Sequence, residues 1–181
     1  LTWLVFAFFV CSAIGHGGNA FVWRTFYESQ LTQCLAPTRY LEYAVSAPIM
    51  FVLIAFTAGV RLYEPLVALA VLISTTMAFG YLGDLLARPS GTMQWTKTFQ
   101  ERLLPFALGA VPYAGAYSVL LASFYDQSAS ADRAPWFVHV IIWAQFALFT
   151  SFAIVPVVQQ ASAPERYYRG EIAFQILSLA S

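Results

Sequence analysis

Charge is scarce in this sequence of 181 residues. Asp, Glu, Lys and Arg together make up 10% of it, whereas hydrophobic residues make up 60%. Soluble domains are normally about one quarter charged, so the composition excludes an ordinary soluble protein and indicates an integral membrane protein. The formal net charge is zero, and no basic patch suggests a nucleic-acid partner.

Cysteine and catalytic motifs are equally scarce. The two cysteines, Cys11 and Cys34, do not make a disulfide framework. No nucleotide, metal or nucleophile motif appears, so we do not expect an enzyme. The chain opens on Leu1 without a basic segment before its first apolar run, which therefore does not resemble a signal peptide. We expect the chain to be a fragment.

Long apolar runs dominate what remains. A membrane-spanning helix needs about 20 mostly apolar residues, and no strand periodicity competes with helix. A last run begins near Glu171 and reaches Ser181 inside the bilayer, so we expect the natural chain to continue. The sequence predicts one all-α transmembrane domain over residues 1–181, with complete spans at 1–23, 41–62, 64–87, 103–125 and 134–158.

The basic residues predict the orientation of these spans. Two of them, Arg61 and Arg133, follow the second and fourth spans, and the others follow the first, third and fifth. Because basic residues concentrate on the cytoplasmic side of membrane proteins, the loops that hold the larger group are predicted to be cytoplasmic: 24–39, 88–102 and 159–170. The larger group comprises Arg24, Arg39, Arg88, Lys97, Arg102, Arg166 and Arg169.

Glu42 is the first candidate for a functional residue. An ionisable side chain inside a membrane span is rare and expensive, and therefore indicates function. Arg39 stands three positions earlier on the same helix face and could share its charge. The rise of about 1.5 Å per residue brings His16 and Ser178 to a comparable depth, so a carboxylate, an imidazole and a hydroxyl could converge. Alternatively, each group bonds its own helix or a neighbouring one.

Several motifs along the chain resemble the heliorhodopsins, a family of retinal-binding membrane proteins with inverted topology. RYLEYAVSAPIMFVLIA at 39–55 resembles their third helix. Other motifs follow in the family's order: SAIGH at 12–16, FGYLGD at 79–84, LLPFALGAVPYAG at 103–115, FTSFAIV at 149–155 and YYRGEIAFQILSLAS at 167–181. The resemblance implies a seven-transmembrane-helix rhodopsin bundle, of which this chain carries helices two to six and half of the seventh.

The resemblance also implies the chemistry of the site. All-trans retinal would be attached as a protonated Schiff base to a lysine directly after Ser181, since Lys97, the chain's one lysine, lies in a polar loop. Glu42 would be the counterion of that cation. Ser178 would lie one helical turn before the lysine and hydrogen bond to the carboxylate or the Schiff base. His16 would be a proton acceptor.

The same resemblance implies the walls of a retinal pocket and a polar network near the cytoplasmic mouth. The pocket residues would be Tyr43, Ser46, Met50, Tyr113, Phe149 and Phe152, and the network Arg39, Tyr168 and Glu171. Arg39 could equally be an interfacial anchor whose charge reaches the membrane surface. Tyr113 stands where an indole is common and Pro156 where a polar residue is common, which leaves the spectral tuning open. Family members suggest a homodimer in the lipid bilayer.

Three functions agree with these residues. The first is a light sensor, in which isomerisation moves the Schiff-base proton and changes the conformation while no ion crosses. The second is a light-driven or light-gated proton transporter or channel, for which Glu64 and His139 are candidate groups in the half away from Glu42. The third is a retinal-free transporter or receptor fragment that binds a substrate with Glu42 and His16. The scarcity of titratable groups in that half favours the sensor.

Overall fold

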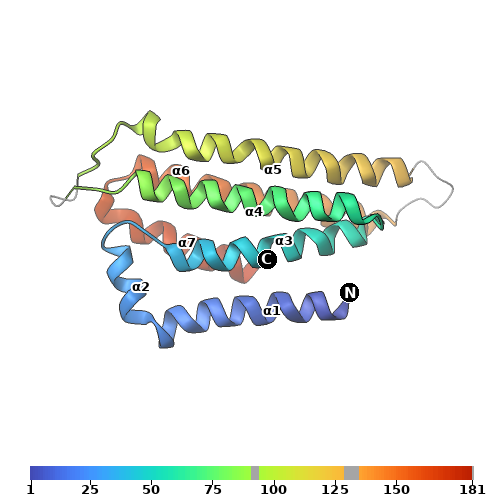
Figure 1. Cartoon of the computed structure of the whole chain (residues 1–181), viewed down its shortest axis with the longest axis horizontal. Coiled ribbons are helices and arrows are strands. Elements are labelled where there is room, and N and C mark those ends of the chain that lie inside the picture. The colour runs from blue at the N-terminus through green and yellow to red at the C-terminus, as the bar shows by residue number, and fades with distance from the viewer. Residues whose placement is uncertain (91–93, 129–134, 181) are drawn as a thin grey trace.

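The computed structural model describes residues 1–90, 94–128 and 135–180, and the described part is helical without β-strands (Figure 1). Two short irregular helices, η1 (Gly18–Val22, π-helical) and η2 (Pro164–Arg166, a 3₁₀ turn), extend or connect the longer ones. The α-helices are α1 (Thr2–Gly17), α2 (Arg24–Leu31), α3 (Pro37–Thr57), α4 (Tyr63–Leu86), α5 (Phe99–Ser128), α6 (Trp136–Ala161) and α7 (Tyr167–Ala180).

Five helical segments are long and apolar enough to cross a membrane, and they coincide with the five predicted spans. They are Thr2–Val22, Pro37–Thr57, Tyr63–Leu86, Phe99–Asp126 and Trp136–Ala161. The sixth run begins at Tyr167, one turn earlier than predicted from Glu171. The integral, multi-pass membrane class and the all-α bundle are therefore confirmed.

The predicted loop at 24–39 is wrong in part, because it contains α2 and the first residues of α3. Arg24 and Glu28, one turn apart on α2, form an exposed ion pair with 2.7 Å between Arg24 Nε and Glu28 Oε1. Such pairs stabilise short helices. Pro37 occupies the first turn of α3, where its missing N–H costs no hydrogen bond. Helix signals were thus present, but α2 is too short and polar to stand out among apolar runs.

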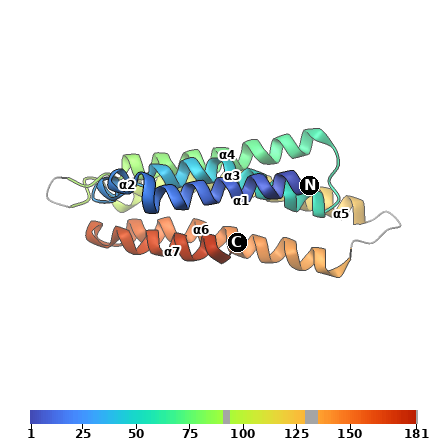
Figure 2. The ribbon, with the colours of Figure 1, turned by 90° about the horizontal axis from the view of Figure 1, so that it is seen from below.

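The helices run lengthwise and give the bundle two distinct ends. We call one the α2 end, where α2 lies and where α3 and α7 begin, and the other the Gly59 end, where α3 turns into α4 (Figure 1). Across the bundle, α5 and α1 lie on opposite sides, with α3 and α4 between them. Figure 2 shows α6 and α7 as a second layer beside α1, α3 and α4.

Gly59 makes the tight turn between α3 and α4. Its φ of 91° lies in the left-handed region that side chains disfavour. The Val60 N–H donates to the Ala55 carbonyl and the Gly59 N–H to the Phe56 carbonyl, which is the Schellman pattern that ends a helix. The link is therefore short and forces α3 and α4 to be antiparallel neighbours, as predicted.

Cys34 fixes the turn between α2 and α3. Its φ is 54°, and its buried thiol donates to the Pro164 carbonyl at 3.6 Å. Burial raises the pKa of the Cys34 thiol to about 12, so the thiolate that reactive cysteines need is disfavoured. Cys11 and Cys34 are both free, and the role of Cys34 is to join α2 to η2.

Small residues allow close contact between α4 and α5. A Cβ added at Gly83 would collide with the Phe106 ring, and one at Gly109 would lie 3.0 Å from Phe79 Cβ. Helices in membranes gain stability from van der Waals packing rather than from the exclusion of water. These glycines therefore contribute to the largest interface in the bundle.

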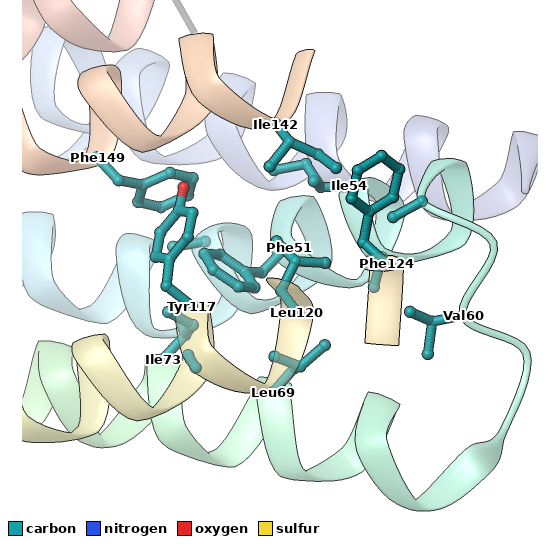
Figure 3. Close-up of a cluster of buried hydrophobic side chains, with 14 of the residues drawn as sticks. Phe51, Ile54, Val60, Leu69, Ile73, Tyr117, Leu120, Phe124, Ile142 and Phe149 are labelled. Atoms are coloured by element: carbon teal, nitrogen blue, oxygen red, sulfur yellow. The ribbon is translucent and has the colours of Figure 1, made fainter. Parts of the chain in front are cut away.

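The apolar core lies toward the Gly59 end. It joins the second half of α3 to the facing parts of α4, α5 and α6, and Figure 3 shows the rings of Phe51, Tyr117 and Phe149 grouped at its inner edge. Its buried members are Ala47, Phe51, Ile54, Ala55, Ala58, Val60, Leu69, Ile73, Ala116, Tyr117, Leu120, Phe124, Val138, Ile142 and Phe149. None of them is acidic, basic or histidine.

We expect Gly83→Val to destabilise the bundle by about 1–3 kcal/mol, because the added side chain overfills a packed contact. The measurement is unfolding of the purified protein in increasing SDS. Gly115→Val is the matched control on α5, since a Cβ there lies 3.8 Å from Leu72, an ordinary contact. Equal losses in the two variants would contradict the close α4–α5 packing at Gly83.

Candidate functional site

Glu42, His16 and Ser178 come together from three helices. Glu42 on α3 is buried, with 7% of its surface exposed. His16 Nε2, near the end of α1, lies 3.5 Å from Glu42 Oε1 and 2.8 Å from Ser178 Oγ on α7. The convergence of a carboxylate, an imidazole and a hydroxyl at one depth is therefore observed. The second contact is a hydrogen bond whose donor depends on the tautomer of His16.

Gly15 makes room for the Glu42 carboxylate. A Cβ at Gly15 would overlap the carboxylate itself, so α1 can approach α3 here only without a side chain. Ser12, one turn earlier on α1, interacts with the same carboxylate. Both residues belong to the SAIGH motif at 12–16, but neither was predicted to be part of the site. The available signal was the i,i+4 spacing of Ser12 from His16, which places both side chains on one face of α1.

The pairing of Glu42 with Arg39 that the sequence suggested is wrong. Arg39 is buried, with 4% exposed, and its guanidinium pairs with Asp84 Oδ2 on α4 at 3.1 Å and with Glu171 on α7. Its guanidinium also lies over the Phe174 ring, 3.9 Å from the centroid. Arg39 therefore points away from Glu42 and is not an interfacial anchor with its charge in water.

Polar groups from four helices complete the network around Arg39. Tyr167 on α7 donates its hydroxyl to Asp84 Oδ2 at 2.6 Å, and Tyr27 on α2 donates to Glu171 Oε2 at 3.2 Å. Gln159 Nε2 on α6 lies 3.3 Å from Glu171 Oε1. We call Arg39, Asp84, Glu171, Tyr27, Gln159 and Tyr167 the arginine network. It lies at the α2 end, where a cytoplasmic mouth was expected.

Tyr168 does not belong to the arginine network, contrary to the sequence prediction. Half of its surface is exposed, and its hydroxyl accepts only a long 3.5 Å contact from Arg169 Nε. Tyr167, the adjacent residue, is 1% exposed and takes the buried position instead. Consecutive helical positions differ by about 100° in direction, so starting α7 at Tyr167 turns this ring inward and its neighbour outward.

Glu42 keeps an unsatisfied atom. Glu42 Oε1 is buried and has no hydrogen-bond partner within the described ranges. The nearest basic group is the His16 imidazole at 3.5 Å, and Arg39 is committed to the arginine network. A buried carboxylate without a cation is costly. The geometry therefore suits a ligand that brings its own positive charge next to Oε1.

An apolar cavity extends across the bundle beside this carboxylate. All six predicted pocket residues line it: Tyr43, Ser46, Met50, Tyr113, Phe149 and Phe152. Ser12 and Ser178 line it on the side of Glu42, and Pro156 is among the other lining residues. The cavity volume is about 140 Å³.

Aromatic packing holds the cavity wall in shape. The Tyr43 and Phe152 rings meet edge to face with centroids 5.6 Å apart, and Phe174 lies 6.4 Å from Tyr43. Phe149 packs in the same manner against Phe51 of the apolar core, at 5.4 Å. Such contacts restrict ring rotation, so packing between α3, α6 and α7 holds this part of the cavity wall in place.

Comparison with known proteins identifies the family of the chain. The sequence model of the heliorhodopsin family matches residues 1–181, the whole chain. Among curated proteins, none matches. Heliorhodopsins are light-sensing rhodopsins with a retinal chromophore, which is a long apolar molecule. The full-length match agrees with the membrane bundle and with the apolar cavity at Glu42, and the chain belongs to the heliorhodopsin family.

Proposed function

We propose that the protein is a light sensor in which Glu42 is the counterion of a protonated retinal Schiff base. The observation that carries the proposal is the buried Glu42 Oε1, which lacks a hydrogen-bond partner among the described residues. It lies 3.5 Å from His16, whose hydrogen-bond partner Ser178 lines an apolar cavity. When bound, all-trans retinal supplies a light-absorbing polyene that ends in a cationic Schiff base. Such a cation would satisfy the carboxylate, and the cavity would hold the polyene.

The expected attachment lysine directly follows Ser181, which lies outside the described residues. The position of Ser178 supports this expectation, because a residue four positions later on α7 returns to the same helix face. Ser178 already reaches the Glu42 layer through its contact with His16. A lysine at that position would direct its side chain toward Glu42 Oε1.

His16 would receive the proton that light displaces, and Ser178 would hold the imidazole by a hydrogen bond. His16 Nε2 is close to both Glu42 Oε1 and Ser178 Oγ, so a proton leaving the Schiff base needs to move only between neighbouring atoms. Histidine is suited to this role because it exchanges protons near neutral pH. Protonating His16 would place a new cation beside Glu42, and this change in charge would drive the conformational signal.

The apolar core supports a sensor rather than a proton conductor. Proton conduction needs titratable groups or water along the whole route, but the core offers neither acid nor base between the cavity and the Gly59 end. His139 packs its ring against Phe124, with centroids 4.7 Å apart, and Glu64 is exposed in the first turn of α4. Both candidate groups therefore lie beyond the core, away from Glu42.

The exposed basic residues support the proposed orientation, with the α2 end in the cytoplasm. Arg39 and Arg102 are buried and do not count as loop charges. The exposed members at this end are Arg24, Arg88, Lys97, Arg166 and Arg169, and Arg61 is exposed at the Gly59 end. Arg133 lies outside the described residues.

We further propose a homodimer in the bilayer. Native mass spectrometry in detergent would contradict this proposal by finding monomer alone.

We expect Glu42→Gln to shift the visible absorption band strongly or to collapse it toward the near ultraviolet. Removing the carboxylate leaves the cationic Schiff base without its counterion, so the neutral form is favoured. The measurement is an absorption spectrum of the full-length protein expressed with all-trans retinal. Glu64→Gln, at an exposed glutamate, is the control and should keep the wild-type spectrum. A wild type without a visible band would contradict retinal binding, and an unchanged Glu42→Gln spectrum would contradict the counterion role.

We expect no sustained photocurrent from the full-length protein in voltage-clamped cells. The reason is the apolar core, which separates His16 and Glu42 from the Gly59 end. A light-driven proton pump expressed in the same cells is the positive control. A steady current under illumination that follows the proton gradient would favour the transporter or channel instead.

We expect a glycosylation acceptor site inserted beside Lys97 to remain unmodified, and one inserted beside Arg61 to be modified. Glycans are added on the lumenal side, whereas the basic α2 end should stay in the cytoplasm. Expression in mammalian microsomes and a gel shift after glycosidase treatment give the measurement. The reverse pattern would invert the proposed orientation.

A further inference from the structure

The π-helical segment η1 joins the Glu42 site to α2. It begins at Gly18, two residues after His16, and Trp23 separates it from the first residue of α2, Arg24. Figure 1 shows that the chain changes direction here, because α2 turns away from the axis of α1. Single π-helical turns are rare and occur frequently at functional sites. A movement of His16 along the chain would reach α2 through η1.

Trp23 closes the π-helical turn with both its backbone and its side chain. Its backbone N–H donates to the Gly18 carbonyl at 2.9 Å, and this bond spans five residues, as a π-helix requires. Its indole Nε1 donates to Asn19 Oδ1 at 2.8 Å. A Cβ added at Gly18 would overlap the indole ring, so the ring lies directly against the backbone of a buried glycine. Trp23 therefore fixes the shape of η1.

The outer side of η1 is exposed and leaves the segment room to move. The exposed fraction is 85% for Phe21 and 78% for Val22. A Cβ added at Gly17, just before η1, would meet no atom of the described residues within 4 Å. On the other side of the turn, α2 is connected to the arginine network by the Tyr27 hydroxyl, which donates to Glu171 Oε2 at 3.2 Å. A change of shape in η1 would act on this hydrogen bond.

We propose that η1 is a hinge that transmits changes at the Glu42 site to α2, and that Trp23 is the positioning residue that holds the hinge in its π-helical form in the dark. The inference rests on the proposed function and adds the route by which the signal leaves the site. Conversion of the π turn to an α turn shifts the helical register by one residue, which corresponds to about 1.5 Å and about 100°. This shift would turn α2 relative to α1 and separate Tyr27 from Glu171.

The experiment is hydrogen–deuterium exchange mass spectrometry of the full-length protein with all-trans retinal, in the dark and under continuous illumination. The measured quantity is the exchange of the backbone amides of residues 24–31, which reports local opening of α2. Illumination should raise this exchange in the wild type. Gly18→Ala displaces the indole, so exchange in the dark should already reach the level of the illuminated wild type, and light should add little. Trp23→Phe keeps a ring but removes the bond to Asn19, and should have the same effect in part.

Two matched controls should behave as the wild type in the dark and in the light. Gly17→Ala makes the same change one residue earlier, where the added methyl group has open space. Trp143→Phe removes an indole at a half-exposed position of α6. A merely structural role of Trp23 would raise exchange in the dark but leave the light-induced increase as large as in the wild type.

The outcomes separate the hinge from the proposed function. A visible wild-type band without a light-induced change in the exchange of α2 overturns the hinge alone, and so does an equal increase in the wild type and Gly18→Ala. A wild type without a visible band overturns the proposed function and the hinge with it. The visible band of each variant reports whether it folds and binds retinal. If Gly18→Ala has no band, Trp23→Phe decides, since it adds no atom to the packed turn.

Discussion

The buried carboxyl group of Glu42 inside an apolar bundle is the constraint on which the site depends. The bundle brings a histidine and a serine to the carboxylate and removes a side chain at Gly15 to make room for it. Within the described residues it supplies no fixed cation, because Arg39, one turn earlier on α3, is paired with two other carboxylates. A buried carboxylate in this position is stable only when it is protonated or when a cation arrives. The cavity beside it is where that cation would enter.

The arginine network completes this arrangement by keeping Arg39 away from Glu42. Two carboxylates, Asp84 and Glu171, hold the guanidinium, and Tyr27 extends the network to α2. The helices α3 and α7 therefore contribute to both the arginine network and the Glu42 site. Arg39 and Glu42 belong to α3, and Glu171 and Ser178 belong to α7. A shift of α7 relative to α3 would alter the arginine network and the Glu42 site at once. A change at Glu42 is therefore physically connected to the α2 end through α3 and α7.

The depth of residues along their membrane spans predicted more of the site correctly than the suggested pairing of side chains did. The rise per residue placed Glu42, His16 and Ser178 in one layer, and the structure has them in contact, because helices that cross a membrane together keep their depth. The partner of Arg39 could not be derived in this way, since a long side chain reaches neighbouring helices as easily as its own. Asp84 was recognisable as an intramembrane acid at the end of a quoted motif, but its partner depends on how α3 and α4 pack. The prediction that placed Tyr168 in the network was wrong by one position, because the sequence does not give the rotation of α7 about its axis.

The apolar core is the feature that favours the proposed sensor over a transporter. The cavity and the arginine network take up the middle of the bundle and the α2 end, and the core fills the side toward Gly59 with closely packed rings and aliphatic chains. Water needs polar partners to remain in such a region, and the core members offer none except the Tyr117 hydroxyl. In the proposed mechanism, a proton displaced from the cavity would therefore find acidic and basic side chains near His16 and toward the α2 end. Packing fills the route to the opposite surface, and this favours the proposed sensor over a proton transporter or channel.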